Sequence, residues 1–496
     1  MNLVDLLSAL PDFHLPIGLR EDLEVTAITQ DSRTAAKGQV FVAIRGGSAD
    51  GWTHAEEAAA RGAAAVVSDR PAPQGFPEGT PWLRVLSARR ALALLAARLA
   101  GDPAEKLVLA GVTGTNGKTT TAMLLESQLA RRYGRAGFVG TVGYRTGRRE
   151  IPATQTTPEA PVLQELLAEM VESGVPAAAM EVSSHALALD RVLGCRFDVA
   201  VFTNLTQDHL DFHGDLETYF DAKKTLFAMR KPGASAVVNA DDPFGRRLAG
   251  EASPPVVTWS PSGGPATVRA ENARCDLAGT ALDVVHPGGR FRISSPLLGR
   301  FNVDNLLGAA AAGLSLGLSG DEVAAGCAAV ARVPGRLERV EAGQPYPIVV
   351  DYAHTEDALR RLLSAVRDLT DLKIILVFGC GGDRDRGKRA PMGQVAGSLA
   401  DIAIATSDNP RSEDPEAILD QVEVGLRASG ATKYLKIADR REAIRTAVDL
   451  ANPGTILVIA GKGHETVQVI GNRSIPFDDR EVVAEFASRR SAGAPG

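Results

Sequence analysis

The chain of 496 residues contains only four cysteines, and no two of them form a Cys-x-x-Cys pair. Their scatter argues against a disulfide framework and against a zinc ribbon. No run of about 18 uncharged apolar residues occurs, so no membrane-spanning helix is expected. The first residues, MNLVDLLSALPDFHLP, lack the basic region of a secretory signal. These absences predict a protein of the reducing cytoplasm.

An excess of positive charge is also missing. Lys and Arg number 54 against 60 Asp and Glu, which gives a net charge of −6 and argues against a nucleic-acid binder. Hydrophobic residues make up 45% and charged residues 23%, so a disordered or fibrous chain is excluded. At roughly 150 residues per domain, the length predicts about three domains.

Short apolar runs alternate with helical patterns, which predicts an α/β fold with mostly parallel sheets. We expect a small α/β domain over residues 1–101, a central domain over 102–335 and a third α/β domain over 336–496. Within the central domain, residues 252–298 hold short alternating runs typical of a small antiparallel excursion. The strands expected at the main sheets lie at 40–44, 64–68, 107–110, 137–142, 177–181, 199–203, 234–239, 348–352, 373–378, 401–406 and 454–460.

A glycine-rich segment, GVTGTNGKT at 111–119, lies between an expected strand and an expected helix. In this context backbone N–H groups and the helix N-terminus bind phosphate. Lys118 would reach the β- and γ-phosphates, and the hydroxyl of Thr119 would bind Mg²⁺. A plain glycine-rich turn is the alternative. The first glycine, Gly111, stands one position earlier than in the general pattern, which argues against a simple nucleoside triphosphatase.

The same segment resembles the ATP loop of the Mur ligases and their folylpolyglutamate synthetase relatives. Other motifs resemble that family in the family's order: DSR at 31–33, EVSSH at 181–185, TNLTQDHLDFHG at 203–214, AK at 222–223, DNLLG at 304–308, GRLE at 335–338, DYAH at 351–354 and GKGHE at 461–465. The resemblance implies an N-terminal UDP-binding domain, a central ATPase domain and a C-terminal Rossmann-like domain. This agrees with the three domains expected from the alternation.

The resemblance further implies a ligase that forms carbon–nitrogen bonds with ATP and Mg²⁺, two ions in all. It is strongest to the member that adds meso-2,6-diaminopimelate to UDP-N-acetylmuramoyl-L-alanyl-D-glutamate, a step of cytoplasmic peptidoglycan precursor synthesis. A carboxylate is a poor electrophile, so ATP would convert it to an acyl phosphate that the amine attacks. The expected partners are these three substrates, without nucleic acid or membrane, and the chain is expected to be a monomer.

Four residues are expected to carry the chemistry: Lys118, Glu181, His209 and Lys223. Glu181 ends an apolar strand, where an acid faces the ligand crevice, and the resemblance implies that it binds Mg²⁺ with Thr119. The resemblance also implies that His209 helps hold a second Mg²⁺ and that Lys223 is carbamylated into a metal ligand. Carbamylation requires a lysine that deprotonates easily, which burial near other cations favours. The alternatives are that Glu181 is a solvated acid at a strand end, that His209 is a structural histidine and that Lys223 lies on a solvated helix face.

The resemblance implies further contacts to each substrate. For ATP they are Gly114, Thr115, Asn116, Gly117, Thr120, Asn305, Arg336, Asp351 and His354. For the UDP-sugar dipeptide they are Ser32, Arg33, Thr156, Thr157, Ser183 and Arg191. Asn305 could instead cap a helix N-terminus, and Asp31-Ser32 could be a capped turn. The sequence departs from the family at Leu189, where glutamine is common, and at Glu356, where proline is usual.

The segment Asp408-Asn409-Pro410-Arg411 follows an expected strand of the third domain, at the end where ligands bind. Arg411 can hold a carboxylate through two parallel N–H bonds, and diaminopimelate differs from lysine by one carboxylate. The resemblance adds Arg384 for the other carboxylate, with Gly461 and Glu465 toward the distal ammonium. The alternative is that Arg411 pairs with Glu413 or Asp414.

Two other functions compete with this one. A folylpolyglutamate synthetase shares the chemistry but gives no reason for the Asp31-Ser-Arg33 domain. A GTPase switch would need a guanine-selecting Asn-Lys-x-Asp, which the sequence lacks. Phosphate release that depends on both acceptors would separate a ligase from the switch.

Overall fold

The computed structural model describes residues 1–11, 23–46 and 49–493. The chain forms two compact units. The first comprises Met1–Ala270, Val284–Phe291 and Asp304–Cys327, and the second Glu271–Asp283, Arg292–Val303 and Ala328–Gly496. Both have the predicted α/β architecture with mostly parallel sheets. The division into three domains at 101 and 335 stays a prediction.

The first unit begins with a four-stranded sheet in the order β1-β2-β3-β4, all parallel. Its strands are β1 (Ala27–Thr29), β2 (Gln39–Ala43), β3 (Ala65–Ser68) and β4 (Trp82–Arg84). The helices are α1 (Leu3–Leu7), η1 (Ser32–Thr34), η2 (Gly51–His54), α2 (Ala55–Ala60) and α3 (Ala88–Leu99). Phe41 and Val42 are neighbours on β2 and therefore point to opposite faces, and both are fully buried, so apolar side chains cover both faces of this sheet at its centre.

A second sheet of eleven strands has the order β15-β14-β13-β12-β11-β10-β5-β9-β6-β7-β8. Its centre, from β12 to β6, is parallel, whereas β7 and β8 pair antiparallel at one edge. The strands are β5 (Val108–Thr113), β6 (Gly137–Gly140), β7 (Gly143–Arg145), β8 (Glu150–Ile151), β9 (Ala177–Glu181), β10 (Phe197–Phe202), β11 (Arg230–Asn239) and β12 (Val256–Ser260). The parallel centre brings the carboxyl ends of β5, β9 and β10 to one edge.

Beyond β12 follow β13 (Val268–Asp276), β14 (Gly279–His286) and β15 (Gly289–Ser295). Neighbours among these three are joined by only two residues, which is the hairpin connection of antiparallel strands. This is the excursion expected from the alternating pattern of residues 252–298.

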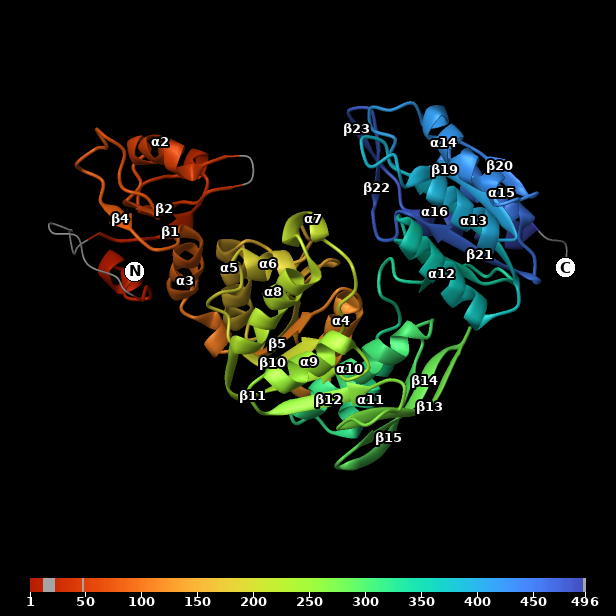
Figure 1. Ribbon diagram of the computed structural model, residues 1–496, viewed down its shortest axis with the longest axis horizontal. Coiled ribbons are helices and arrows are strands. Elements are labelled where there is room, and N and C mark those ends of the chain that lie inside the picture. The colour runs from red at the N-terminus through yellow and green to blue at the C-terminus, as the bar shows by residue number, and fades with distance from the viewer. Residues whose placement is uncertain (12–22, 47–48, 494–496) are drawn as a thin grey trace. The chain divides into compact units, whose positions relative to one another are not determined.

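Helices cover the central strands on both sides (Figure 1). They are η3 (Pro103–Glu105), α4 (Lys118–Tyr133), α5 (Ala160–Glu172), α6 (Ser184–Ala188), α7 (Leu210–His213), α8 (Leu216–Ala228), α9 (Pro243–Glu251), α10 (Phe301–Ser315) and α11 (Gly320–Ala329). Because α10 begins at Phe301, Asn305 lies in its second turn. The suggestion that Asn305 caps a helix N-terminus is therefore wrong.

The second unit is built on a sheet in the order β16-β17-β21-β18-β19-β20, parallel except at β16. Its strands are β16 (Glu338–Arg339), β17 (Ile348–Asp351), β18 (Lys373–Cys380), β19 (Ile402–Ser407), β20 (Tyr434–Lys436) and β21 (Thr455–Ala460). A separate hairpin is formed by β22 (Val467–Ile470) and β23 (Arg473–Pro476).

The apolar runs of this sheet are buried on both faces. One face packs against α12 (Glu356–Leu369), α13 (Arg389–Leu399) and α14 (Pro415–Ala428), the other against α15 (Arg440–Leu450) and α16 (Asp479–Gly493) (Figure 1). Along β18, Leu376 belongs to the first core and Val377 to the second. Within residues 1–11, 23–46 and 49–493, no helix has both the length and the apolar character needed to cross a lipid bilayer.

Candidate active site

The glycine-rich loop joins the end of β5 to the start of α4, as the sequence predicts. Its backbone is held by the segment that follows β10: Thr115 N–H donates to Asn204 O (2.8 Å) and Asn116 N–H to Asn204 Oδ1 (3.0 Å). Thr203 Oγ1 donates to Asn116 O (2.6 Å). The loop is therefore a fixed cradle at the N-terminus of a 16-residue helix, which is the geometry that binds phosphate.

Two glycines of this loop are required by close approach. Gly114 and Gly117 have φ of +147° and +85°. A Cβ at Gly114 would lie 1.9 Å from Thr203 Oγ1, and one at Gly117 would lie 2.3 Å from Asn305 Oδ1. The second contact brings Asn305 of α10 against the loop, so this predicted nucleotide residue meets the cradle. Thr120 is buried in the first turn of α4.

Thr119 and Glu181 meet at the ends of α4 and β9. Thr119 Oγ1 donates to Glu181 Oε2 (2.8 Å), and the other oxygen, Oε1, accepts from Thr141 N–H (2.7 Å). The Glu181 side chain is buried. A solvated strand-end acid, the alternative for Glu181, is thus not what the structure contains. A hydroxyl and a carboxylate this close are oxygen ligands of the kind that Mg²⁺ prefers.

Lys223, on α8, is buried beside the same loop. Its Nζ donates to Gly114 O (2.7 Å) and lies 4.3 Å from the centroid of the Tyr219 ring. Burial lowers the pKa of Lys223 well below its ordinary value, and the nearby Lys118 lowers it further. Lys224, by contrast, is exposed and forms an ion pair with Glu251. Of the two adjacent lysines, only Lys223 has the environment that favours a neutral amine.

His209 lies after β10 in the left-handed region, with φ of +52°, and 47% of its side chain is exposed. Its ring packs edge-on against His185 with centroids 4.7 Å apart. His213 is buried and its Nε2 is 3.0 Å from Ser184 Oγ, so it braces α6. Burial lowers the pKa of His185, and His209 adds to the effect. His209 is the accessible imidazole of this group.

Ser32 and Arg33, which are predicted to contact the UDP-sugar, lie on η1. Asp31 caps η1 and accepts from the backbone and the side chain of Arg33, and these hydrogen bonds lower the pKa of Asp31 to about 2. Ser32 is buried and donates to Glu57 Oε2 (2.9 Å). The segment is thus the capped turn suggested by its sequence, and it leaves the Arg33 side chain 80% exposed.

The residues predicted for the peptide gather at the end of β9. Thr157 Oγ1 donates to Glu181 O (2.8 Å) and accepts from Ser183 N–H (3.0 Å). Arg191 donates to Thr157 O (3.2 Å), and Thr156 Oγ1 lies 3.0 Å from Thr141 Oγ1. Thr156, Thr157, Ser183 and Arg191 therefore form one cluster around Glu181. Ser183 also caps α6, and Leu189 ends that helix.

In the second unit, Asp351 ends β17 and its carboxylate accepts from Leu337 N–H (2.7 Å) and Ala353 N–H (2.8 Å). Burial raises the pKa of Asp351 against these hydrogen bonds. Arg336 is exposed in the loop after α11. His354 Nδ1 lies 2.9 Å from Tyr352 O, despite Glu356 replacing the usual proline.

Arg384 and Arg411 flank Gly381, at the carboxyl end of β18. A Cβ built on Gly381 would lie 3.0 Å from Arg411 Nη1 and 3.8 Å from Arg384 Cγ. Arg411 donates to Gly382 O (2.7 Å). Glu413 instead forms ion pairs with Arg389 and Arg386. The pKa of Glu413 is lowered to about 2, and the largest cause is its hydrogen bond with Arg389. The suggestion that Arg411 pairs with Glu413 is therefore wrong.

Asp414, the other suggested partner of Arg411, instead caps the N-terminus of α14 with its side chain. Among the residues that the structure describes, neither Arg384 nor Arg411 forms an ion pair with a carboxylate. The main chain at Pro410 lies close to Gly382, because a Cβ built on Gly382 would lie 1.9 Å from the carbonyl oxygen of Pro410. Two arginines thus lie near Gly381 without an ion pair among the described residues, and this suits a ligand with carboxylates. Arg411 still acts on Asp383: hydrogen bonds from Ser412 are the first cause that lowers the pKa of Asp383, and the charge of Arg411 adds to the effect.

Lys462 is a residue that the sequence reasoning missed. It is fully buried and its Nζ lies 3.0 Å from Glu465 Oε2, 3.2 Å from Asn409 Oδ1 and 3.7 Å from Asp408 Oδ1. Gly461, before it, has φ of +120° and donates to Asp351 O (3.1 Å). The sequence did carry a signal for Lys462: it lies just after an apolar strand, in the motif GKGHE, for which the sequence analysis gave a role only to Gly461 and Glu465.

Arg440 was missed too. Fully buried at the start of α15, it forms a two-bond ion pair with Asp479 (2.6 and 2.7 Å). It also donates to Ser407 O (3.3 Å) and Ala460 O (3.0 Å), the last residues of β19 and β21. These strands lead into Asp408–Arg411 and Gly461–Glu465, so Arg440 ties the bases of both loops together.

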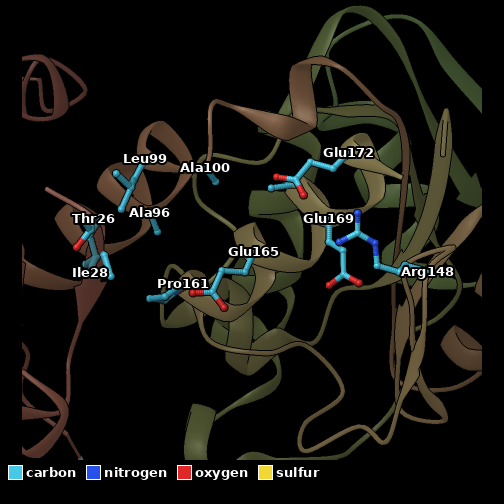
Figure 2. Close-up of a pocket in the computed structure, with 12 residues that line it drawn as sticks. Thr26, Ile28, Ala96, Leu99, Ala100, Arg148, Pro161, Glu165, Glu169 and Glu172 are labelled. Atoms are coloured by element: carbon cyan, nitrogen blue, oxygen red, sulfur yellow. The ribbon is translucent and has the colours of Figure 1, made fainter. Parts of the chain in front are cut away.

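The first unit also holds a pocket of about 320 Å³ lined by residues of β1, α3 and α5 (Figure 2). Its walls carry Glu165, Glu169, Glu172 and Arg148 besides apolar side chains. Glu169 is already held by Arg149 and Thr146. None of the predicted site residues lines this pocket, so the pocket is separate from the glycine-rich loop at 111–119.

Three family models match the chain along most of its length. Residues 24–99 match the Mur ligase family catalytic domain, residues 112–313 the Mur ligase middle domain, and residues 335–463 the Mur ligase glutamate ligase domain. The matches include the glycine-rich loop and the loop that carries Arg411.

Curated relatives and a solved structure agree with these matches. The UDP-N-acetylmuramoyl-L-alanyl-D-glutamate–2,6-diaminopimelate ligases of Geobacter metallireducens and Geobacillus kaustophilus are 46% and 47% identical to this chain. The alignments cover 95% and 99% of this chain and 96% and 100% of those proteins. A solved structure of a ligase with the same name has a TM-score of 0.74 at 34% identity, with both chains fully covered. The chain belongs to the Mur ligase family.

Proposed function

We propose that the chain is an ATP-dependent ligase that joins meso-2,6-diaminopimelate to UDP-N-acetylmuramoyl-L-alanyl-D-glutamate. The observation that carries the proposal is the loop Asp408–Arg411, in which Asn409 Nδ2 donates to Glu465 Oε2 (3.1 Å) and Arg411 lies with Arg384 beside Gly381, neither arginine in an ion pair among the described residues. A carboxylate and an arginine on adjoining loops suit an amino acid that carries an ammonium and a carboxylate at its far end. The near full-length relatives that bear this name support the same substrate.

The reaction begins with the glutamate carboxylate of the dipeptide. An oxygen of that carboxylate attacks the γ-phosphorus of ATP, and the bond from phosphorus to the bridging oxygen breaks, so ADP leaves and an acyl phosphate forms. The neutral amine of diaminopimelate then attacks the acyl carbon, phosphate leaves, and the amine gives up a proton. Both partners of the first step are anions, so the site must supply cations and exclude water.

For the nucleotide, the loop from Gly114 to Thr120 would hold the phosphates, with Lys118 at the β- and γ-phosphates. Lys118 Nζ already bonds the carbonyls of Gly114 and Thr115, so it lies across the mouth of the cradle. Asn305 adds a contact beside Gly117. Arg336, Asp351 and His354 are the residues of the second unit proposed for the ribose and phosphates.

Two Mg²⁺ ions are part of the proposal, and the donors present fit them. Thr119 and Glu181 offer adjacent oxygens for one ion, and His209 with carbamylated Lys223 would hold the other. Within the described ranges no three His, Cys, Asp or Glu side chains gather as a metal site. The proposed sites accordingly use a hydroxyl, a modified lysine and nucleotide oxygens. The ions would neutralise the charge of the phosphates.

Carbamylation of Lys223 is supported by its environment. The neutral amine attacks the carbon of CO₂ and loses one proton, which leaves an anionic carbamate with two oxygens. The low pKa of Lys223, caused first by burial and then by Lys118, favours the neutral amine that this step needs. An anionic carbamate would then replace a buried neutral amine and could serve as a metal ligand.

The sugar-peptide would bind between Ser32 and Arg33 at one end and the cluster of Thr156, Thr157, Ser183 and Arg191 at the other. That cluster surrounds Glu181, which suits a substrate whose carboxylate must meet the γ-phosphate. Leu189 would remove one hydrogen bond common in the family. The proposal includes a monomer in the cytoplasm, where the reaction feeds the cell wall and so cell shape and division.

Phosphate release tests this function. We expect the purified protein to release phosphate from ATP only when both UDP-N-acetylmuramoyl-L-alanyl-D-glutamate and meso-diaminopimelate are present, with one tripeptide formed per phosphate. Turnover with L-lysine should be far slower. Steady ATP hydrolysis without acceptors, or equal use of L-lysine, would contradict the proposal.

A further inference from the structure

We propose that Lys462 is a positioning residue of the amino-acid pocket, which holds Asn409 and Glu465 as one hydrogen-bonded unit and sets the charge that a bound ammonium group balances. The inference rests on the proposed function, because that function assigns Glu465 to the distal ammonium of diaminopimelate. Lys462 itself is fully buried and acts through its two neighbours.

The first argument is geometry. Lys462 Nζ donates to Glu465 Oε2 (3.0 Å) and to Asn409 Oδ1 (3.2 Å), and Asn409 Nδ2 donates to the same Oε2 (3.1 Å). These three contacts close a ring. Asn409 Oδ1 also accepts from Val469 N–H (2.9 Å), so the ring is anchored to β22. Because 32% of the Glu465 side chain is exposed, the ring presents that carboxylate to a ligand while Lys462 stays behind it.

The second argument is charge. Lys462 Nζ is 3.7 Å from Asp408 Oδ1, a buried oxygen that has no hydrogen-bond partner among the described residues. Arg440, the other buried cation nearby, is already neutralised by Asp479. Two carboxylates therefore share one ammonium, and a single negative charge remains. One ligand ammonium balances that charge, whereas without Lys462 the buried Asp408 and the half-buried Glu465 would lack a shared cation, which is unfavourable.

The third argument is the ionisation of Glu465. Burial raises the pKa of Glu465, but the charge and the hydrogen bond of Lys462, followed by Asn409 and His464, together outweigh burial, and the pKa is lowered. The other groups that face this carboxylate are Asp408 after β19, Tyr352 after β17, Arg440 on α15 and His464 on its own loop. Lys462 is the one that bonds Glu465 directly as a cation. Removing it should let Glu465 take up a proton at a higher pH.

The test is steady-state kinetics of full-length Lys462→Met. We expect the KM for meso-diaminopimelate to rise at least about tenfold at pH 8, a tenfold change being 1.36 kcal/mol. The KM values for ATP and the UDP-dipeptide should stay within about twofold of the wild type. As the pH falls from about 8.5 to about 6, the KM for diaminopimelate of the variant should rise more than that of the wild type, because Glu465 becomes protonated.

A double-mutant cycle adds a second measurement. Because Lys462 acts through Glu465, Lys462→Met combined with Glu465→Gln should lose little more than the worse single variant. Lys436→Met is the matched control: Lys436 also joins two carboxylates, Asp420 and Glu423, but on the edge strand β20. It should leave all three KM values unchanged.

Three results would overturn the inference: an unchanged KM for diaminopimelate, an equal rise of all three KM values, or additive losses in the double variant. If Lys462→Met has no cooperative melting transition, Lys462→Gln is measured against the same criteria. A wild-type protein that does not use diaminopimelate at all would instead refute the proposed function.

Discussion

Lys118 and Lys223 donate to the same carbonyl oxygen, that of Gly114, at 3.0 and 2.7 Å. Two ammonium groups on one oxygen repel each other, and Lys223 is the more deeply buried of the two. Its proton is therefore the easier one to lose. The carbonyl group of Gly114 thus brings together two lysines with different roles. Lys118 remains a cation that can bind phosphate, whereas Lys223 is the amine that more easily becomes neutral.

Replacing Lys223 by alanine should abolish ligation, because neither the amine nor its carbamate would remain. High bicarbonate should not restore the activity. Product formation and phosphate release measure the effect, and Lys224→Ala is the control, since Lys224 is exposed and pairs with Glu251. A nearly normal rate in Lys223→Ala would end the carbamate assignment.

Lys223 should also make stability depend on pH. The unfolded lysine binds a proton below its ordinary pKa, whereas in the folded protein the pKa of Lys223 is lowered, first by burial and then by Lys118. Between the two pKa values the unfolded state holds the extra proton, so the free energy of unfolding falls as the pH falls.

Lys223→Met keeps a long unbranched side chain at this position but removes the amine that binds the proton. In CO₂-free buffer without Mg²⁺, urea unfolding should show the wild type losing stability relative to Lys223→Met as the pH is lowered from about 10 to about 7. Parallel pH profiles of the two proteins would show that Lys223 stays charged when folded.

Arg411→Ala should lose about 100-fold or more in kcat/KM with meso-diaminopimelate, because a carboxylate of the substrate would lack its guanidinium partner. The preference over L-lysine should shrink at the same time. Arg386→Ala is a suitable control, since Arg386 lies in the same region but pairs with Glu413. An intact preference in Arg411→Ala would show that another group selects the amino acid.

Arg440→Ala should lower the free energy of unfolding by about 3–5 kcal/mol, because Asp479 would be left as an unpaired buried charge. Chemical denaturation with a constant m-value measures this. The neighbouring Arg441 pairs with Glu485 at the surface, so Arg441→Ala should cost only a small fraction of that. Equal losses in the two variants would contradict the buried-pair argument.

The strands and the phosphate loop could be predicted because their signals are local. Apolar runs such as Ala177–Glu181 have the same bounds in sequence and structure, and Gly114 and Gly117 stand where only glycine fits. The place of Asn305 in its helix was harder to predict. Because α10 begins at Phe301, one turn before Asn305, Asn305 lies inside the helix and does not cap its N-terminus. Helix ends depend on hydrogen bonds that the sequence does not show.

The ring around Lys462 and the Arg440 pair could not be predicted, because each needs a partner that is distant along the chain, Asn409 for Lys462 and Asp479 for Arg440. Lys462 lies 53 residues from Asn409, and Arg440 lies 39 residues from Asp479. A lysine between two glycines is typical of an exposed loop. Only the parallel order of β19 and β21 around β18 brings their ends close enough to bury it.

Arg440 holds the strand ends through the main-chain carbonyls of Ser407 and Ala460. Carbonyl groups are common to every amino acid, so this attachment does not depend on which side chains occupy the two loops. If Asn409 and Arg411 select the amino acid, as we propose, substitutions there would change that choice while Arg440 still holds both strand ends. In evolution, a ligase built this way can acquire a new substrate by a few local exchanges, without a new fold.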